Sequence, residues 1–309
     1  MPLQYNNVVV FGPTGQVGGA AALEANRRGA TVHLAMRDPT KPIPAISASE
    51  EQSGSFHRIK ADLTDPLSVK AAIESSGAKA AFIYHVPSGD GLRSSLKAMK
   101  DAGVEYIVFL SSFSIEPHHE IRKIPAEELI PFFHAQIEVA LEDLEIPFVA
   151  LRPAQFATNL VGMGLDRSVT PWEAKVLHGD SVGDCISPVD IGRVAGAVLV
   201  EKPSKAHKEV IYLCGPKLRS TDEQWDVIKR VSGRDIKVVH QNPEEYANFL
   251  KAKGFPPPIV AYLIANTGKE RLEKMYHEPL YSDAVANIKK YSDYEPTTFE
   301  EFMATQDLG

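Results

Sequence analysis

The fold of this chain is decided by residues 8–18, which read VVVFGPTGQVG. Four consecutive apolar residues are typical of a parallel strand that is buried on both faces. The glycines that follow have the spacing G-x-x-G-x-x-G, which allows a tight turn, close approach of a diphosphate to the backbone and close packing of the next helix. The stretch therefore predicts a strand, a phosphate-binding turn and a helix. A glycine turn that holds no ligand is the alternative.

Further apolar runs predict the rest of a sheet in the first half of the chain. With the first, they occupy residues 8–11, 31–35, 56–60, 81–85, 106–110 and 148–151. Helical stretches lie between most of them. One begins at Asp65-Pro66 and ends at Gly77, another spans about 90–102, and three prolines disfavour a helix at the start of residues 38–54. This alternation predicts an α/β fold with a doubly wound parallel Rossmann sheet, to which we assign residues 1–155.

The regular alternation of strand and helix patterns ends after Arg152. Ser187 and Ser220 each begin a pattern of the capping-box kind, which predicts a helix start, and residues 210–214 predict one more strand. Ile259, Tyr262 and Leu263 form an apolar stripe of the kind that usually faces a core. We therefore predict that residues 156–309 form a smaller, mostly helical C-terminal lobe. It leans on the sheet, or interleaves with it, and borders a substrate cleft.

Composition argues against several classes of function. The formal net charge of -7 disfavours nonspecific nucleic-acid binding, and no apolar stretch reaches the roughly 20 residues of a membrane span. Residues 1–11 carry no basic segment of the kind that opens a signal peptide. The only two cysteines, Cys185 and Cys214, form no metal-binding cluster. We expect a cytoplasmic protein without a metal site that binds neither nucleic acid nor membrane.

The end of the second predicted strand indicates which dinucleotide is bound. An NAD site normally has an acidic residue there, for the ribose hydroxyls. Here the strand is followed by Arg37, and Lys41 lies four positions further on. Asp38 comes one position late, and we expect it to point away. An arginine can pair with a 2′-phosphate, and such a charge-assisted hydrogen bond contributes about 1.5–3 kcal/mol, or roughly 10- to 150-fold in affinity. We therefore expect NADP(H), with a solvated surface arginine as the alternative.

Asp62 and Leu63 directly follow the third predicted strand. A carboxylate at this place can accept a hydrogen bond from the adenine amino group, so we expect the pair to contact adenine. A carboxylate that only caps a turn is the alternative for Asp62.

With these motifs in place, the chain resembles the NmrA-like group of atypical short-chain dehydrogenases/reductases, which includes quinone reductases and isoflavone reductase-like proteins. The resemblance covers most of the chain. It rests on the Gly12–Gly18 loop, Arg37-Asp38-Pro39, residues 61–66 (ADLTDP), residues 109–112 (FLSS), and Leu151-Arg152-Pro153 with Phe156 and Asn159. It implies an NADP(H) site with a cleft over the nicotinamide. Some members transfer hydride, whereas NmrA itself reports redox state to a transcription factor, and the fold does not choose between them.

One helix departs from the pattern of the wider family. Short-chain dehydrogenases typically use a Y-x-x-x-K pair, in which the lysine holds the ribose and lowers the tyrosine pKa. The resemblance places Phe132 and Gln136 at these positions. Gln136 can hydrogen-bond a ribose hydroxyl but cannot shift a pKa by its charge. The change argues against ordinary tyrosine-based acid catalysis, although some quinone reductases of the group share a His-x-(Glu/Gln)-x-Glu pattern at this helix.

Other polar side chains follow the predicted strands at the edge where ligands bind in such sheets. Histidine with a pKa near 6.5 is a credible general acid, so His85 and His134 are the preferred proton donors, with structural or cofactor-contacting roles as the alternative. The catalytic candidates are His85, His134, Ser112 and Tyr84. We expect His118 and His119, in a polar loop, to be solvated.

The sequence thus predicts an NADPH-dependent oxidoreductase that reduces a small carbonyl, quinone or conjugated substrate. The expected cofactor residues are Gly12, Thr14, Gly15, Gln16 and Val17 for the diphosphate, Arg37 and Lys41 for the 2′-phosphate, Asp62 and Leu63 for adenine, and His85, Val86, Ser111, Gln136 and Pro153 for the ribose and nicotinamide. Two alternatives stay open. One is a non-catalytic NADP(H) sensor that binds a protein partner, and the other is a biosynthetic isomerase or cyclase.

Overall fold

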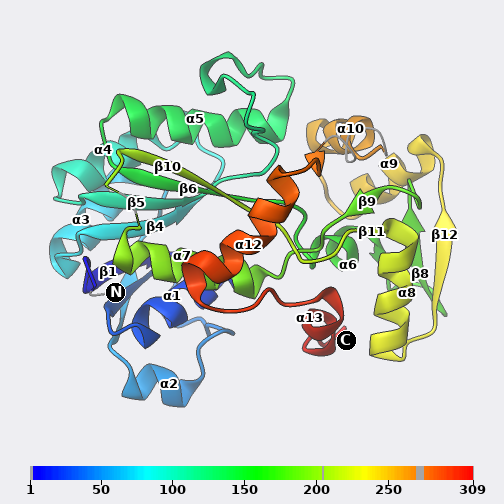
Figure 1. Ribbon diagram of the computed structural model, residues 1–309, viewed down its shortest axis with the longest axis horizontal. Helices are drawn as coiled ribbons and strands as arrows, with labels where there is room; N and C mark the ends of the chain where they lie inside the picture. Colours follow the sequence, from blue (N-terminus) through cyan, green and yellow to red (C-terminus); the bar gives the residue numbers. More distant parts are fainter. Residues whose placement is uncertain (1–2, 204, 269–274, 309) are drawn as a thin grey trace.

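A parallel sheet forms the centre of the computed structural model, which describes residues 3–203, 205–268 and 275–308 (Figure 1). In spatial order its seven strands are β10 (Lys208–Leu213), β6 (Phe148–Pro153), β5 (Tyr106–Leu110), β4 (Ala80–Tyr84), β1 (Asn7–Phe11), β2 (Thr31–Met36) and β3 (Phe56–Lys60). Every neighbouring pair is parallel. The order reverses between β1 and β4, which confirms the predicted doubly wound Rossmann sheet and places a crevice at this point.

Helices cover both faces of the sheet (Figure 1). One face carries α1 (Gln16–Arg27), α7 (Pro188–Glu201) and α12 (Leu280–Ser292), and the other carries α3 (Pro66–Ser76), α4 (Arg93–Asp101) and α5 (Leu129–Asp143). Val8 and Val10 of β1 pack into the first core, and Val9 and Phe11 into the second. This two-sided burial explains why the strand is a continuous apolar run rather than an alternating one.

Small residues allow α7 to lie directly against α1. A Cβ added at Gly192 would lie 2.4 Å from the Cβ of Ala20, and one added at Gly196 would lie 2.5 Å from the carbonyl oxygen of Ala21. Both distances are shorter than atoms can tolerate, so this interface needs glycine. Because α1 also begins at the phosphate loop, the packing fixes the direction in which that loop presents its amides.

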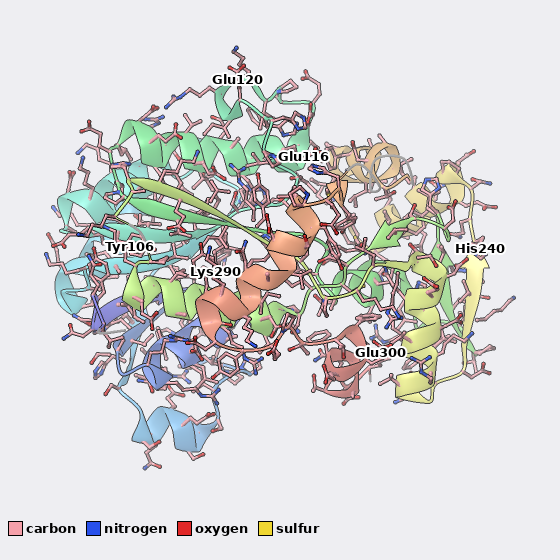
Figure 2. The ribbon with its side chains drawn as sticks, in the orientation of Figure 1. Tyr106, Glu116, Glu120, His240, Lys290 and Glu300 are labelled. Atoms are coloured by element: carbon pink, nitrogen blue, oxygen red, sulfur yellow. The ribbon has the colours of Figure 1, made fainter. Side chains whose placement is uncertain are left out.

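Residues beyond β6 contribute to both parts of the molecule. While α7, β10 and α12 lie on the main sheet, the remainder forms an outer lobe with its own core around Trp225 (Figure 1). The elements of the outer lobe are α6 (Asn159–Gly164), β7 (Leu165–Asp166), β8 (Trp172–Val176), β9 (Val182–Gly183), β11 (Arg219–Ser220), α8 (Thr221–Ser232), β12 (Ile236–His240), α9 (Pro243–Ala252), α10 (Pro257–Asn266) and α13 (Phe299–Ala304). Glu300 of α13 lies beside α8, where it pairs with Arg219 and Arg230 (Figure 2).

The outer lobe is mostly helical, as predicted, but it also contains two small sheets. One has the order β12-β8-β7 and the other pairs β11 with β9. These strands were not predicted from the sequence. β7, β9 and β11 have only two residues each and leave no periodicity to detect, whereas β8 and β12 have five residues each and were overlooked. Within the described residues, no helix has the length and apolarity needed to cross a membrane.

Local signals placed several helix ends correctly. Asp65 caps α3, which ends at Gly77 with φ of 62°, and Ser220 forms a capping box with Glu223 at the start of α8. The helix expected at about 90–102 begins later, at Arg93, because Gly91 and Leu92 adopt left-handed backbone conformations. Between β2 and β3, only the short α2 (Ala48–Ser53) forms, well after the three prolines.

We predict that Gly196→Val destabilises the protein strongly, because the new side chain must push α7 away from α1. Overpacking of this kind costs about 1–3 kcal/mol or more. Gly162→Ala in α6 is the matched control, since a Cβ there meets no atom within 4 Å. It should change stability by no more than about 1 kcal/mol. Urea unfolding of both variants checks the prediction, and equal midpoints would contradict it.

Candidate functional site

The turn between β1 and α1 has the geometry of a phosphate-binding loop. Gly12 adopts φ of +70°, and a Cβ there would lie 2.4 Å from the Tyr84 ring. A Cβ on Gly18 would lie 2.3 Å from the carbonyl oxygen of Gly12, so this glycine lets α1 start close to the turn. No side chain caps α1 at Gly15. The amides of the first helical turn, at Gln16 and Val17, and the positive end of the helix dipole are therefore available to an anion.

A cavity of about 340 Å³, the small cavity, lies beside this turn at the carboxyl ends of β1 to β4. The predicted cofactor residues that line it are Gly12, Thr14, Arg37, Asp62, Leu63 and Val86. Val86 was expected at the nicotinamide end and instead lies here with Pro87. Lys41 is not among the lining residues, and it lies in the exposed turn that follows Arg37.

The charges around the small cavity favour an anion. Within the described residues, the exposed Arg37 guanidinium has neither a hydrogen bond nor an ion pair to another side chain, so it is available to a ligand. Asp38 does point away, as expected, because its carboxylate accepts hydrogen bonds from the backbone and hydroxyl of Thr40. These bonds, together with the ammonium groups of Lys41 and Lys60, lower the pKa of Asp38.

Asp62 caps a turn while it lines the small cavity. Its Oδ1 accepts from the backbone N and the hydroxyl of Thr64, at 2.9 and 2.8 Å. These bonds, and the nearby Arg37 guanidinium, lower the pKa of the Asp62 carboxyl. The turn-cap alternative is therefore observed, and an adenine contact stays a prediction.

A larger cavity of about 510 Å³, the large cavity, lies between the main sheet and the outer lobe. Six predicted site residues line it: Tyr84, His85, Ser111, Ser112, His134 and Pro153. The opposite wall contains Tyr246 of α9 and Tyr262 and Leu263 of α10, which the sequence analysis did not identify. It took the stripe on α10 for ordinary core, because a helical period alone does not show what a helix faces. Tyr84 lines both cavities and marks the place where they meet.

Three histidines line the large cavity: His85, His134 and His178. His85 and His134 are neutral at pH 7, which corrects the expectation that these two imidazoles titrate near 6.5. Burial lowers the pKa of His134 to about 4 and lowers that of His85 as well. Nδ1 of His134 lies 2.8 Å from the carbonyl oxygen of Ile130, which can only accept, so this nitrogen carries the proton and Nε2 is left as an acceptor. The rings of His85 and His134 lie 5.2 Å apart. His134 is therefore uncharged at neutral pH.

A buried ion pair lies behind the wall of the large cavity, where it is hydrogen-bonded to the lining residue Ser111. Glu138 of α5 is fully buried and accepts two hydrogen bonds from Arg152 of β6, at 3.1 and 2.7 Å, and one from the hydroxyl of Ser111 at 2.7 Å. Arg152 also donates to the carbonyl oxygen of Ile115 and to the hydroxyl of Tyr212. Burial alone would raise the pKa of Glu138, but Arg152 lowers it below its usual value.

The structure corrects the expected role of Gln136. This side chain is exposed beside Gly91 and lines neither cavity. His134 and Glu138, four residues apart, face the sheet instead, because two residues along a helix rotate the side chain by about 200°. The expected contact of Gln136 with the ribose is therefore not supported by the cavity lining, in which His134 is the residue of this part of α5 that takes part.

The loop between β5 and α5 carries His118 and His119 away from the cavities. Neither histidine lines a cavity, and Nδ1 of His119 accepts a hydrogen bond from the backbone of Glu116 (Figure 2). His118 is 70% exposed, as expected for a solvated side chain.

Asp184, which the sequence analysis missed, joins three segments behind the large cavity. Its carboxylate accepts from the backbone N of Gln155, the backbone N of Gly215 and the hydroxyl of Tyr276, at 2.9, 2.7 and 2.8 Å. Gln155 and Tyr276 line the cavity. Burial raises the pKa of Asp184 to about 6, although these hydrogen bonds oppose the shift. No sequence signal marks this residue, since its partners are 29 or more positions away.

This pKa predicts a pH-dependent stability. Between its usual value of 3.8 and about 6, the folded protein binds the Asp184 proton more tightly than the unfolded chain. The resulting stabilisation is therefore present at low pH and is lost as pH rises through 6. The unfolding free energy of the wild type minus that of Asp184→Asn should fall by about 2 kcal/mol from pH 4 to pH 7.5, because only the wild type loses this stabilisation. Denaturant titrations at several pH values measure it, and a constant difference would refute the assignment.

Known proteins resemble this chain both in sequence and in fold. The NmrA-like family matches residues 4–303. A nitrogen metabolite regulation-like protein, bik4, of Gibberella fujikuroi is 41% identical over 97% of this chain and 96% of its own length. Among solved structures, the NADPH-dependent quinone oxidoreductase QOR2 of Escherichia coli in complex with NADPH has a TM-score of 0.69 at 18% identity. The triphenylmethane reductase of Citrobacter sp. complexed with NADP(H) has a TM-score of 0.67 at 21% identity. Both alignments cover 96% of this chain and 98% of the other, and they show the fold.

Proposed function

Because the chain belongs to the NmrA-like family, we propose that it is an NADPH-dependent reductase of a small, largely apolar acceptor such as a quinone or a conjugated carbonyl. The observation that carries the proposal is the meeting of two different cavities at Tyr84. One is bordered by an unpaired guanidinium and a helix start, and the other is lined mainly by apolar and aromatic groups. This arrangement matches a ligand that is anionic at one end and reacts at the other. Its structural similarity to a quinone oxidoreductase and a triphenylmethane reductase supports the proposal.

The residues present fit NADP(H) along this path. The amides of the Gly12–Val17 turn would hold the diphosphate, Arg37 with Lys41 the 2′-phosphate, and Leu63 and Val86 the adenosine. When bound, NADPH supplies the hydride. Burial raises the pKa of the Tyr84 phenol above its usual value, and the nearby Arg37 guanidinium opposes this shift only in part. We propose that Tyr84 contacts the cofactor at the junction of the cavities rather than donating a proton.

The large cavity would orient the acceptor and exclude water. The rings of Tyr246 and Tyr262 provide apolar faces that suit a planar molecule. On the opposite wall the hydroxyl of Ser112 shares a hydrogen bond of 2.8 Å with Ser114 and can turn to donate to the acceptor oxygen. The neutral imidazole of His85 is the second group in position to donate. Each would regain its proton from water after the reduced product leaves, so the reduced oxygen can be protonated without a charged acid.

We predict that the purified protein oxidises NADPH when it is mixed with small quinones and enones, measured as loss of NADPH absorbance. Ser112→Ala should lower kcat about tenfold, because one hydrogen bond to the developing charge is lost, and should leave the affinity for NADPH unchanged. Thr305→Ala in the outer lobe, away from both cavities, is the control. Binding of NADPH without oxidation by any acceptor in the panel would contradict the reductase proposal.

Removal of the Arg37 guanidinium should weaken NADP⁺ selectively. We expect Arg37→Ala to raise the Kd of NADP⁺ by roughly 10- to 150-fold and to leave that of NAD⁺ nearly unchanged, because NAD⁺ lacks the 2′-phosphate. Lys70→Ala removes an exposed cation from α3 and serves as the control. Calorimetric titration of each variant with both dinucleotides measures the effect. An equal loss for NADP⁺ and NAD⁺ would argue against the assignment.

A second candidate is an NADP(H)-binding regulator that signals through a protein partner. Two observations favour it: the 41% identical relative is named for nitrogen metabolite regulation, and neither of the candidate proton donors His85 and His134 is a charged acid at pH 7. A regulator would discriminate between NADP⁺ and NADPH in affinity and show no turnover. A reductase would oxidise NADPH in the presence of an acceptor, whichever of the two forms it binds more tightly. For either candidate we expect a cytoplasmic location, in keeping with the two buried thiols.

A further inference from the structure

The turn after β2 is held in place by a side chain from the neighbouring strand. Nη1 of Arg58, in β3, donates to the carbonyl oxygens of Pro39 and Lys41, at 2.6 and 2.7 Å. Both carbonyls belong to the exposed turn, residues 38–41, that begins directly after Arg37. Arg58 therefore holds the backbone that carries Lys41 and that adjoins Arg37, the two cations predicted for the 2′-phosphate.

Four of the five N–H donors of Arg58 are used in hydrogen bonds within the protein. Its Nε and Nη2 donate to the two carboxylate oxygens of Glu51 on α2, so that the ion pair is bidentate. The hydrogen bonds from Arg58 lower the pKa of Glu51 and keep its carboxyl ionised. Because its donors are used in this way, Arg58 has a positional role, whereas Arg37 is left free to bind a ligand.

The rest of the segment between β2 and β3 is anchored independently of Arg58. Ile43 and Ile46 are buried in the core shared with α1, and the Cβ of Ala45 lies where a side chain on Gly19 would have to be. Arg27 of α1 pairs with Glu50 of α2 at 3.0 Å. Loss of Arg58 should therefore release only the turn at residues 38–41 and leave the remainder of the segment in place.

We propose that Arg58 is a positioning residue that selects a dinucleotide with a 2′-phosphate, because it holds the 38–41 turn in the conformation from which Arg37 and Lys41 meet that phosphate. The inference rests on the proposed cofactor site. A ligand that needs one conformation binds in proportion to the fraction of molecules that adopt it. If the freed turn adopts that conformation one time in ten, the Kd of NADP⁺ rises about tenfold. NAD⁺ makes no contact with the turn and should bind as before.

The test compares Arg58→Met with Arg27→Met by calorimetric titration with NADP⁺ and with NAD⁺. Methionine keeps an apolar stem in both variants, and Arg27→Met breaks an ion pair to the same helix without touching the turn. We expect the preference for NADP⁺ to fall about tenfold in Arg58→Met and to stay unchanged in Arg27→Met. Arg58→Lys, which can keep part of the donor set, should lie between Arg58→Met and wild type, and it replaces Arg58→Met if that variant does not fold.

Each outcome decides a different question. An unchanged preference in Arg58→Met, or equal losses for both dinucleotides, overturns the positioning role while the cofactor site stands. A wild-type protein that binds neither dinucleotide overturns the proposed function and this inference with it.

Discussion

The buried ion pair between Glu138 and Arg152 is the interaction on which the carboxyl edge of the sheet depends. It joins α5 to β6, orients the hydroxyl of Ser111 after β5, and reaches Tyr212 of β10 through the guanidinium. Removal of either partner would leave an uncompensated charge in the interior, a change that costs about 3–5 kcal/mol in other proteins. Because α5 is fixed in rotation by Glu138, His134 one turn earlier must face the large cavity and Gln136 must face solvent.

The two cavities differ in the physical properties that a dinucleotide-dependent reaction requires. Around the small cavity, an uncapped helix start and an unpaired guanidinium favour phosphate groups. Around the large cavity, burial keeps His85 and His134 neutral and aromatic rings form much of the wall. Hydride transfer needs water to be excluded at one end of the cofactor and strong anion binding at the other. The placement of Tyr84 between the cavities gives each end its own environment.

Features encoded within a short stretch of sequence were predicted well. The run from Val8 to Gly18, the cap at Asp65 and the capping box at Ser220 involve neighbours in the chain, so their patterns alone specify the structure. Arg37 was correctly placed beside the glycine turn, because its position relative to that turn is set by the length of one strand and one helix. The same reasoning placed Ser111, Ser112 and His85 at the correct edge of the sheet.

Features that depend on distant partners were missed or misplaced. The rotation of α5 is set by Arg152, which lies 14 residues after Glu138, and the tyrosines of the far wall come from helices about 100 residues later in the chain. The protonation state of His134 follows from burial, which composition and spacing do not reveal. The role of Asp184 likewise depends on hydrogen bonds to Gly215 and Tyr276, which are distant from it in the sequence.

The most direct test of this account is a crystal structure of the protein with NADP⁺ bound. We expect the 2′-phosphate within hydrogen-bonding distance of Arg37, the diphosphate on the amides at the start of α1, and the nicotinamide ring facing the large cavity near His85 and Ser112. A dinucleotide whose phosphates lie away from that helix start, or whose nicotinamide is kept out of the large cavity, would contradict it.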